Sequence, residues 1–269
     1  EVSAMERTQV CYEYDGTFAG FLTCVFESYA HKEEPACFLG PEDGRYTLWD
    51  TRRVETDEAR AVRVWKGICR NISPAAGELV SRGFLTCLDQ RELHIWRFVE
   101  YGFRRGSSVM ADLGDERVDT LRRAVRHLGD EAHLYSGFVR FSDQYGVLIS
   151  EIEPKNRVLP ILKGHFSRRF NTEQFIIYDR THREALVHRP GKCAIVPLDD
   201  FAPAPPGEEE LTYRRLWRRF FRTIAIRERE NPRCQNTHLP KRYRAMMTEF
   251  WEDESGQPAL GSAGRSPGL

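Results

Sequence analysis

The chain has 269 residues, of which 41% are hydrophobic and 30% are charged. This length allows one large domain or two small ones, and the composition is that of a folded globular protein rather than a disordered one. No apolar run approaches the roughly 18–20 residues of a membrane span. No signal peptide is visible either. We therefore expect a cytoplasmic protein that does not bind membranes.

The seven cysteines are widely spaced, and no two lie within four residues of each other. This spacing excludes the CxxC pairs of zinc ribbons and the compact thiolate runs of iron–sulfur sites. Walker A, HExxH, GxSxG and zinc-deaminase motifs do not occur in the sequence. The sequence predicts free, mostly buried thiols, and it indicates neither a metal site nor a cofactor.

The net charge of zero hides an uneven distribution. Residues 1–60 carry 6 basic and 13 acidic side chains, whereas residues 211–245 carry 11 basic and 2 acidic ones. A concentrated basic segment is typical of a site for a polyanion. Arginine outnumbers lysine 34 to 6, which suits bidentate phosphate recognition but also fits a GC-rich genome.

The N-terminal half combines strand and helix signals. Asp15-Gly16-Thr17 predicts a turn and a helix N-cap, and Glu33-Glu34-Pro35 predicts the end of that helix. The predicted strands are Val10–Tyr14 and Tyr46–Val54. The predicted helices are Phe18–Lys32, the segment capped by Thr56-Asp57-Glu58, Pro74 to about Cys87, Arg91–Arg105, and Asp115–Leu128 with Gly129 at its end.

The C-terminal half begins with strand signals. The predicted strands are His133–Phe141, Gly146–Ile152, Gln174–Asp179, Ala185–His188 and Cys193–Leu198, with a helix or irregular turn over Leu159–Phe170. They are followed by a proline-rich linker (Phe201–Gly207), a long helix (Glu208–Arg229) broken at Asn231-Pro232, and a low-complexity tail (Gln257–Leu269).

These patterns predict an α+β fold with a helix-rich N-terminal half, a central, mainly antiparallel sheet and a C-terminal amphipathic basic helix. We divide the chain into an N-terminal α/β-helical region (5–130), a β-rich region (131–200), the basic helix with a polar loop (208–250) and a disordered tail (255–269).

The helix predicted over Glu208–Arg229 has two unlike sides. Its apolar side carries Tyr213, Leu216, Trp217, Phe220, Phe221 and Ile224. Its basic side carries Arg214, Arg215, Arg218, Arg219 and Arg222. We expect the apolar side to be packed, because an exposed aromatic stripe favours aggregation. The arginines are interpreted either as a phosphate-binding surface or as a solvated face paired with the acidic first sixty residues.

Two further basic segments are candidates for contact with nucleic acid. The first follows the helix and is stiffened by two prolines; its candidate residues are Arg233, Gln235, Arg242 and Tyr243. The second contains Arg168 and Arg169 next to phenylalanines. The alternative for the first segment is a C-terminal tail held onto the domain by satisfied hydrogen bonds.

Three residues are candidates for catalysis: His165, Asp179 and His238. A histidine titrates near neutral pH, and Asp179 orients His165 if the two meet in space. A structural role for His165 is the alternative. Asp15, Gly16 and Thr17 form a second type of candidate, an anion site at a helix N-terminus, although the full glycine-rich nucleotide pattern is missing.

Several of these stretches together resemble a known family of uncharacterised bacterial proteins that are described as DNA metabolism or repair proteins. The matching residues are Tyr14-Asp15-Gly16-Thr17-Phe18; Gly164-His165-Phe166 with Arg168-Arg169-Phe170; Ile177-Tyr178-Asp179; Leu216-Trp217; and the run from Phe221 through Asn231-Pro232, His238-Leu239-Pro240 and Arg242-Tyr243 to Thr248-Glu249-Phe250. The resemblance spans about residues 10–250. It implies a radical-SAM partner with a helix-hairpin-helix DNA-binding region, and relatives of this domain also precede uracil-DNA glycosylase-like domains.

The leading hypothesis is an accessory protein that binds DNA through the arginine side of the helix and works with that radical-SAM partner. A second hypothesis is a nuclease or base-modifying hydrolase that uses His165, Asp179 and His238. A third is a non-catalytic interaction module in which the acidic N-terminal segment neutralises the basic one. The sequence leaves open whether the protein is an enzyme.

Overall fold

A computed structural model of the protein describes residues 8–41, 44, 47–199, 201–202, 205–224, 236–237 and 239–250. The chain divides into two compact units, Glu1–Gly129 and Asp130–Leu269. Helix α5 (Glu116–Phe138) crosses this division, so it contributes residues to both units.

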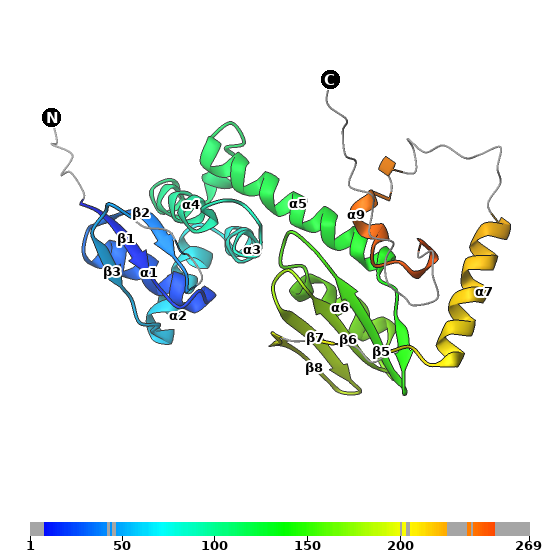
Figure 1. Ribbon diagram of the computed structural model, residues 1–269. Coiled ribbons are helices and arrows are strands. Elements are labelled where there is room, and N and C mark those ends of the chain that lie inside the picture. Colours follow the sequence, from blue (N-terminus) through cyan, green and yellow to red (C-terminus); the bar gives the residue numbers. More distant parts are fainter. Residues whose placement is uncertain are drawn as a thin grey trace, which may run out of the picture. The chain divides into compact units, whose positions relative to one another are not determined.

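The first unit contains a three-stranded parallel sheet (Figure 1). Strand β1 (Gln9–Glu13) is central, with β2 (Glu34–Leu39) on one side and β3 (Thr51–Arg53) on the other. Five helical elements and the start of α5 complete the unit: α1 (Phe18–Ala30), α2 (Glu58–Asn71), α3 (Pro74–Gly83), α4 (Arg91–Arg105) and the short η1 (Gly106–Ala111).

Side-chain caps fix where the helices of this unit begin. The Thr17 hydroxyl accepts a hydrogen bond from the Gly20 amide at 2.9 Å, and Asp57 accepts hydrogen bonds from the first amides of α2. Each cap satisfies backbone donors that a helix leaves unpaired. The fully buried core includes Tyr12, Phe21 and Phe98.

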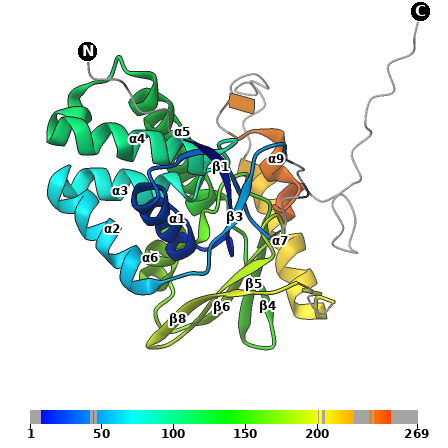
Figure 2. The ribbon, with the colours of Figure 1, turned by 90° about the vertical axis from the view of Figure 1, so that its left-hand side faces the viewer.

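The second unit contains a five-stranded sheet in the order β4-β5-β6-β7-β8 (Figure 2). Helix α6 (Leu159–Arg169) connects β5 to β6, which run parallel, while the other neighbouring pairs are antiparallel. The strands are β4 (Ser142–Gln144), β5 (Val147–Ile152), β6 (Gln174–Asp179), β7 (Glu184–Arg189) and β8 (Lys192–Pro197). The predicted α+β class, with its mainly antiparallel sheet, is confirmed.

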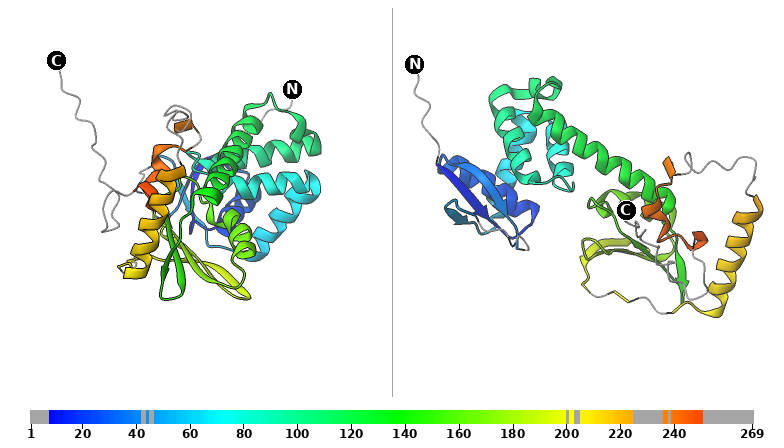
Figure 3. Two further views of the ribbon diagram at one scale, coloured as in Figure 1. Left: turned by 90° about the vertical axis from the view of Figure 1, so that its right-hand side faces the viewer. Right: turned by 45° about the horizontal axis from the view of Figure 1, so that its top comes forward.

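Helical elements also follow this sheet. Helix α7 (Glu208–Ile224, gold in Figure 3) contacts β4 and the short η3 (Thr248–Phe250), and α9 spans Lys241–Arg244. The three glutamates in the first turn of α7 suit the positive end of its dipole. These elements bring the basic segment into contact with one edge of the sheet.

Most of the predicted helices and strands are confirmed. Helix α4 and strand β6 have the bounds predicted for them, and α6 lies where a helix or irregular turn was expected. Strand β3 is only three residues long and occupies the end of the strand predicted over Tyr46–Val54.

The predicted strand over His133–Phe141 is wrong, because α5 continues to Phe138. Its buried residues keep helical spacing through this region, at positions 118, 121, 128, 132 and 135. Gly129 therefore lies inside the helix rather than at its end. A glycine weakens a helix interior by about 1 kcal/mol but does not terminate it when a continuous apolar face is buried.

Strand β2 is absent from the predictions because Pro35 was interpreted as a helix stop. In the structure β2 is an edge strand that pairs with β1, and Pro35 is paired in register with Val10. An edge strand tolerates proline, since one of its sides has no neighbouring strand to receive a hydrogen bond.

The prediction that all cysteines are free is wrong for one pair. Cys11 in β1 and Cys37 in β2 form a disulfide, and their Cα atoms lie 4.7 Å apart. The two strands are adjacent in the sheet, so residues 26 positions apart in sequence become direct neighbours. Among the described cysteines, Cys24, Cys69, Cys87 and Cys193 form no disulfide, and Cys24 alone of these four is buried, while Cys234 lies outside the described residues.

Candidate nucleic-acid interface

The solvent exposure of helix α7 differs from the one that the sequence predicts. The apolar side predicted to be packed is largely exposed: Trp217 is 41% exposed, Phe220 53% and Tyr213 61%. Leu216 is also exposed. The prediction of a buried apolar side is therefore wrong for these four residues. The side chains of Phe221, Arg222 and Ile224 lie outside the described part of the structure.

Arg214 explains this orientation, because its side chain is the inward one and is only 10% exposed. Its Nε donates to Glu210 Oε1 at 2.7 Å, and its Nη2 donates to the Ser142 hydroxyl in β4 at 2.6 Å. A second oxygen of Glu210 accepts a hydrogen bond from the Asp143 amide at 3.3 Å. These polar contacts attach α7 to the sheet edge through Arg214, while Tyr213 and Trp217 line a pocket beside it and remain largely exposed.

The remaining arginines divide according to their position around the helix. Successive residues are rotated by about 100°, so Arg218 follows Arg214 on the inward side and is half-buried, whereas Arg215 and Arg219 are exposed. Arg215 donates to the Thr212 hydroxyl at 3.0 Å, one turn earlier. We call the exposed surface formed by Tyr213, Arg215, Leu216, Trp217, Arg219 and Phe220 the α7 strip.

An open pocket of about 420 Å³ adjoins the α7 strip. Phe141 forms part of its wall, and Phe141 is held by Phe166, Phe170 and Phe175, whose ring centroids lie 5.1–5.9 Å from its own. The residues that line the pocket are Arg140, Phe141, Glu210, Tyr213, Arg214 and Trp217.

Arg242 and Tyr243, predicted to contact nucleic acid, instead attach the C-terminal segment to α5. The Arg242 guanidinium pairs with Glu131 at 3.0 Å, and the glutamate side chain is 1% exposed. Tyr243 is 2% exposed and its ring centroid lies 4.9 Å from that of Tyr135. These contacts support the alternative of a tail held by hydrogen bonds. Arg233 and Gln235 lie outside the described residues.

Glu131 is the centre of this attachment, and the sequence patterns did not point to it. Its two carboxylate oxygens accept hydrogen bonds from the amides of Lys155 and Asn156 and from the Asn156 side chain, at 2.7–3.1 Å. A second buried glutamate, Glu249, pairs with Arg140 at 2.8 Å. Neither Glu131 nor Glu210, the partners of Arg242 and Arg214, belongs to the acidic first sixty residues.

Arg168 and Arg169 are exposed at the C-terminal end of α6. The Arg169 guanidinium lies 5.8 Å from the centroid of the Phe170 ring. These two arginines are on a different element from the α7 strip, and Arg169 is linked to the pocket beside the strip only indirectly, through the rings of Phe170 and Phe141.

Asp179 contacts His182 rather than His165, the partner predicted from the sequence. Asp179 is fully buried at the end of β6, and its carboxylate is 2.7 Å from Nδ1 of His182. It also accepts hydrogen bonds from the amides of Thr181 and His182. His182 is not among the predicted site residues, although the spacing Asp-x-x-His across a turn is the signal that indicates it.

His165 lies in α6, where its ring packs against a phenylalanine. Its Nε2 atom is buried without a hydrogen-bond partner, and its ring contacts Phe166 with centroids 4.9 Å apart. A nitrogen shielded in this way is poorly placed to take a proton from a substrate. His238 lies outside the described residues, so a catalytic role for the three residues stays a prediction.

The predicted anion site at Asp15, Gly16 and Thr17 is occupied by the protein's own carboxylate. Asp15 accepts hydrogen bonds from the Thr17 amide at 2.9 Å and from the Thr56 hydroxyl at 2.6 Å. Burial opposes ionisation of Asp15, but the hydrogen bonds from Thr56 and Thr17 outweigh it and lower its pKa. An ionised carboxylate in this position repels a second anion.

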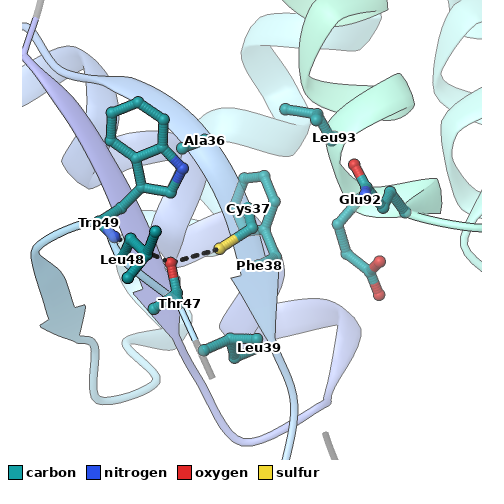
Figure 4. Close-up of a pocket in the computed structure, with 10 residues that line it drawn as sticks. Ala36, Cys37, Phe38, Leu39, Thr47, Leu48, Trp49, Glu92 and Leu93 are labelled. Atoms are coloured by element: carbon teal, nitrogen blue, oxygen red, sulfur yellow. Dashed lines mark hydrogen bonds between the residues drawn. The ribbon is translucent and has the colours of Figure 1, made fainter. Parts of the chain in front are cut away.

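The first unit also has a pocket at the β2 edge of its sheet (Figure 4). Phe38, Trp49 and Glu92 are among the side chains drawn around it. The Glu92 carboxylate accepts a hydrogen bond from the Tyr14 hydroxyl at 2.9 Å. None of the sequence-predicted site residues lines this pocket, so it is not a candidate for the predicted functions.

Two classes of site are not found in the described part of the chain. Its helices include none long and apolar enough to cross a membrane. Across the same residues, no group of three or more His, Cys, Asp or Glu side chains is arranged to hold a metal ion.

A family model matches residues 89–249, which is more than half of the chain. The chain belongs to the DUF4130 family. This family is described as a domain of unknown function. A comparison with curated proteins finds no match. The DUF4130 segment includes α7, the pocket beside it, Glu131 and Asp179, whereas Asp15, Gly16 and Thr17 lie outside it.

Proposed function

We propose that this DUF4130 protein binds DNA through the α7 strip and acts as an accessory protein in DNA repair or modification. One observation carries the proposal: a single helix exposes two arginines on one side and three aromatic rings on the other. Both kinds of side chain are exposed in the described structure.

The two kinds of side chain match the two parts of a nucleotide. An arginine guanidinium forms paired hydrogen bonds with phosphate oxygens, and it releases counterions from the strand when it does so. An exposed aromatic ring offers a surface on which a base stacks. The ring centroids of Trp217 and Phe220 lie 5.8 Å apart at an interplanar angle of 30°, so the two rings form one platform.

We further propose that the protein works in the cytoplasm with a radical-SAM protein that carries a helix-hairpin-helix region. The resemblance of Gly164-His165-Phe166 and Arg168-Arg169-Phe170 to the DNA metabolism family supports this partnership. The partner supplies the iron–sulfur cluster, because the cysteines of this chain lack cluster spacing. Co-purification of the two proteins from cells tests the partnership, and failure to co-purify contradicts it.

Charge reversal on α7 tests the nucleic-acid proposal. The double variant Arg215→Glu/Arg219→Glu is expected to bind DNA more weakly than the unchanged protein. Its binding is also expected to depend less on salt, with the slope of log K against log salt reduced by about 1 for each arginine. Fluorescence anisotropy titrations at several salt concentrations measure both quantities.

A matched control keeps the net charge change but moves it to the first unit. Arg97 is exposed on α4, and Arg123 is 68% exposed on α5. Arg97→Glu/Arg123→Glu is expected to retain the salt slope of the unchanged protein. If the two double variants bind DNA equally well, α7 is not the binding surface and the proposal is wrong.

A further inference from the structure

The pocket beside the α7 strip combines aromatic walls with a neutral polar part. Phe141, Tyr213 and Trp217 supply three rings from two separate segments of the chain. Glu210 and Arg214 form an ion pair within the lining, so the carboxylate there carries no uncompensated charge. Arg140 is likewise engaged with Glu249. The lining therefore favours a flat, uncharged, polar-edged ring rather than a phosphate.

The size of the pocket suits such a ring. Its volume of about 420 Å³ is within the range of sites that hold small molecules.

We propose that this pocket takes one unstacked base of a single-stranded nucleic acid. The inference rests on the proposed nucleic-acid binding and adds the form of the ligand. A base inside a duplex has both faces covered by its neighbours and its edge paired. Only a base that is single-stranded or flipped out of a duplex presents its faces to Phe141, Tyr213 and Trp217.

Three probes separate base recognition from charge attraction. They are a single strand of about 15 nucleotides, the duplex of the same sequence, and a strand of the same length whose sugars carry no bases. All contain phosphates, but only the first presents unstacked bases. We expect the single strand to bind at least about fivefold more tightly than either of the other two, measured by fluorescence anisotropy.

Variants of Trp217 assign the effect to the pocket. Trp217→Ala is expected to weaken binding of the single strand at least about fivefold and to leave binding of the base-free strand unchanged. Trp217→Phe is expected to restore most of the loss, because it keeps an aromatic face. The control is Tyr145→Ala, which removes a 93% exposed aromatic ring at the β4–β5 turn and is expected to change nothing.

Several outcomes would overturn the inference. Equal binding of the three probes, with the arginine variants still defective, leaves DNA binding in place but shows that no base is recognised. Loss of single-strand binding in Tyr145→Ala to the same extent as in Trp217→Ala shows that the pocket is not the site. A protein dimer that Trp217→Ala dissociates, without any change in single-strand binding, assigns the aromatic surface to a contact between two copies.

Discussion

Single residues in the second unit connect more segments of the chain than their positions in the sequence suggest. Glu131 lies within a helix, yet its buried carboxylate has partners in two distant segments: it accepts hydrogen bonds from the loop at 155–156 and pairs with Arg242 near the C-terminus. A buried carboxylate is stable only when its oxygens are fully engaged. Glu131 is therefore a structural residue within the DUF4130 segment.

Glu131→Ala is expected to lower the free energy of unfolding by about 3 kcal/mol, because it leaves buried amide donors without acceptors. Urea denaturation measures the change. The control is Glu153→Ala, which removes a glutamate that is 47% exposed and pairs with Arg180 at the surface. That change is expected to cost less than about 1 kcal/mol. Equal losses in the two variants would contradict the role given to Glu131.

Asp15 gives a pH-dependent prediction. Its pKa is lower in the folded protein than in the unfolded chain, so its ionised form stabilises the fold above the ordinary aspartate pKa of about 3.9. This contribution is lost as the pH falls through the lowered folded value. Asp15→Asn is expected to be less stable at pH 7 by up to about 1 kcal/mol, through the lost charge at the helix N-terminus.

The difference between Asp15→Asn and the unchanged protein should disappear in acid, below the pKa of the folded carboxyl group. Denaturation curves at a series of pH values measure it. A difference that persists unchanged in acid would show that the side-chain charge is not the cause.

At the scale of elements, α5 and α7 are the two helices that the patterns described least well. Helix α5 was expected to stop at Gly129, and α7 was expected to bury its aromatic side. In both cases the sequence pattern contained the correct helical periodicity. What it lacked was the neighbour against which each face packs, and the neighbour decides where a helix ends and which side is covered.

Gly129→Ala tests the continuity of α5. A methyl group at this position would meet no atom within 4 Å, and Gly129 lies inside the helix. The variant is expected to be more stable by about 0.5–1 kcal/mol, because alanine favours a helix interior over glycine. Thermal denaturation measures the gain.

The matched control is Gly146→Ala in the β4–β5 turn, where φ is +85° and a side chain is strained. This variant is expected to be less stable than the unchanged protein. If Gly129→Ala is also destabilising, Gly129 ends a helix after all, and the strand predicted from His133 regains support.

On the scale of the whole molecule, each of the two units buries apolar side chains of its own. Leu121 belongs to the core of the first unit, whereas Phe175 lies in the aromatic cluster of the second. Both residues are fully buried. Units with separate cores can unfold at different temperatures.

Calorimetry of the full chain is therefore expected to show two unfolding transitions. Leu121→Ala should destabilise the first unit by about 2–5 kcal/mol and Phe175→Ala the second by about 3–5 kcal/mol, each through a cavity in its own core. Each variant should shift only one transition. A single transition that both variants shift equally would show that the two units unfold together.

Local sequence patterns determined the parts of this protein that depend on near neighbours. The caps at Thr17 and Asp57, the bounds of α4 and β6, the α+β class and the amphipathic character of α7 all follow from residues a few positions apart. Tertiary structure decided what depends on distant residues. The Cys11–Cys37 pairing, the ion pair of Arg242 with Glu131 and the exposure of Trp217 each depend on partners brought together by the fold. Periodicity shows that a helix has two sides, but only the packing partner determines which side solvent reaches.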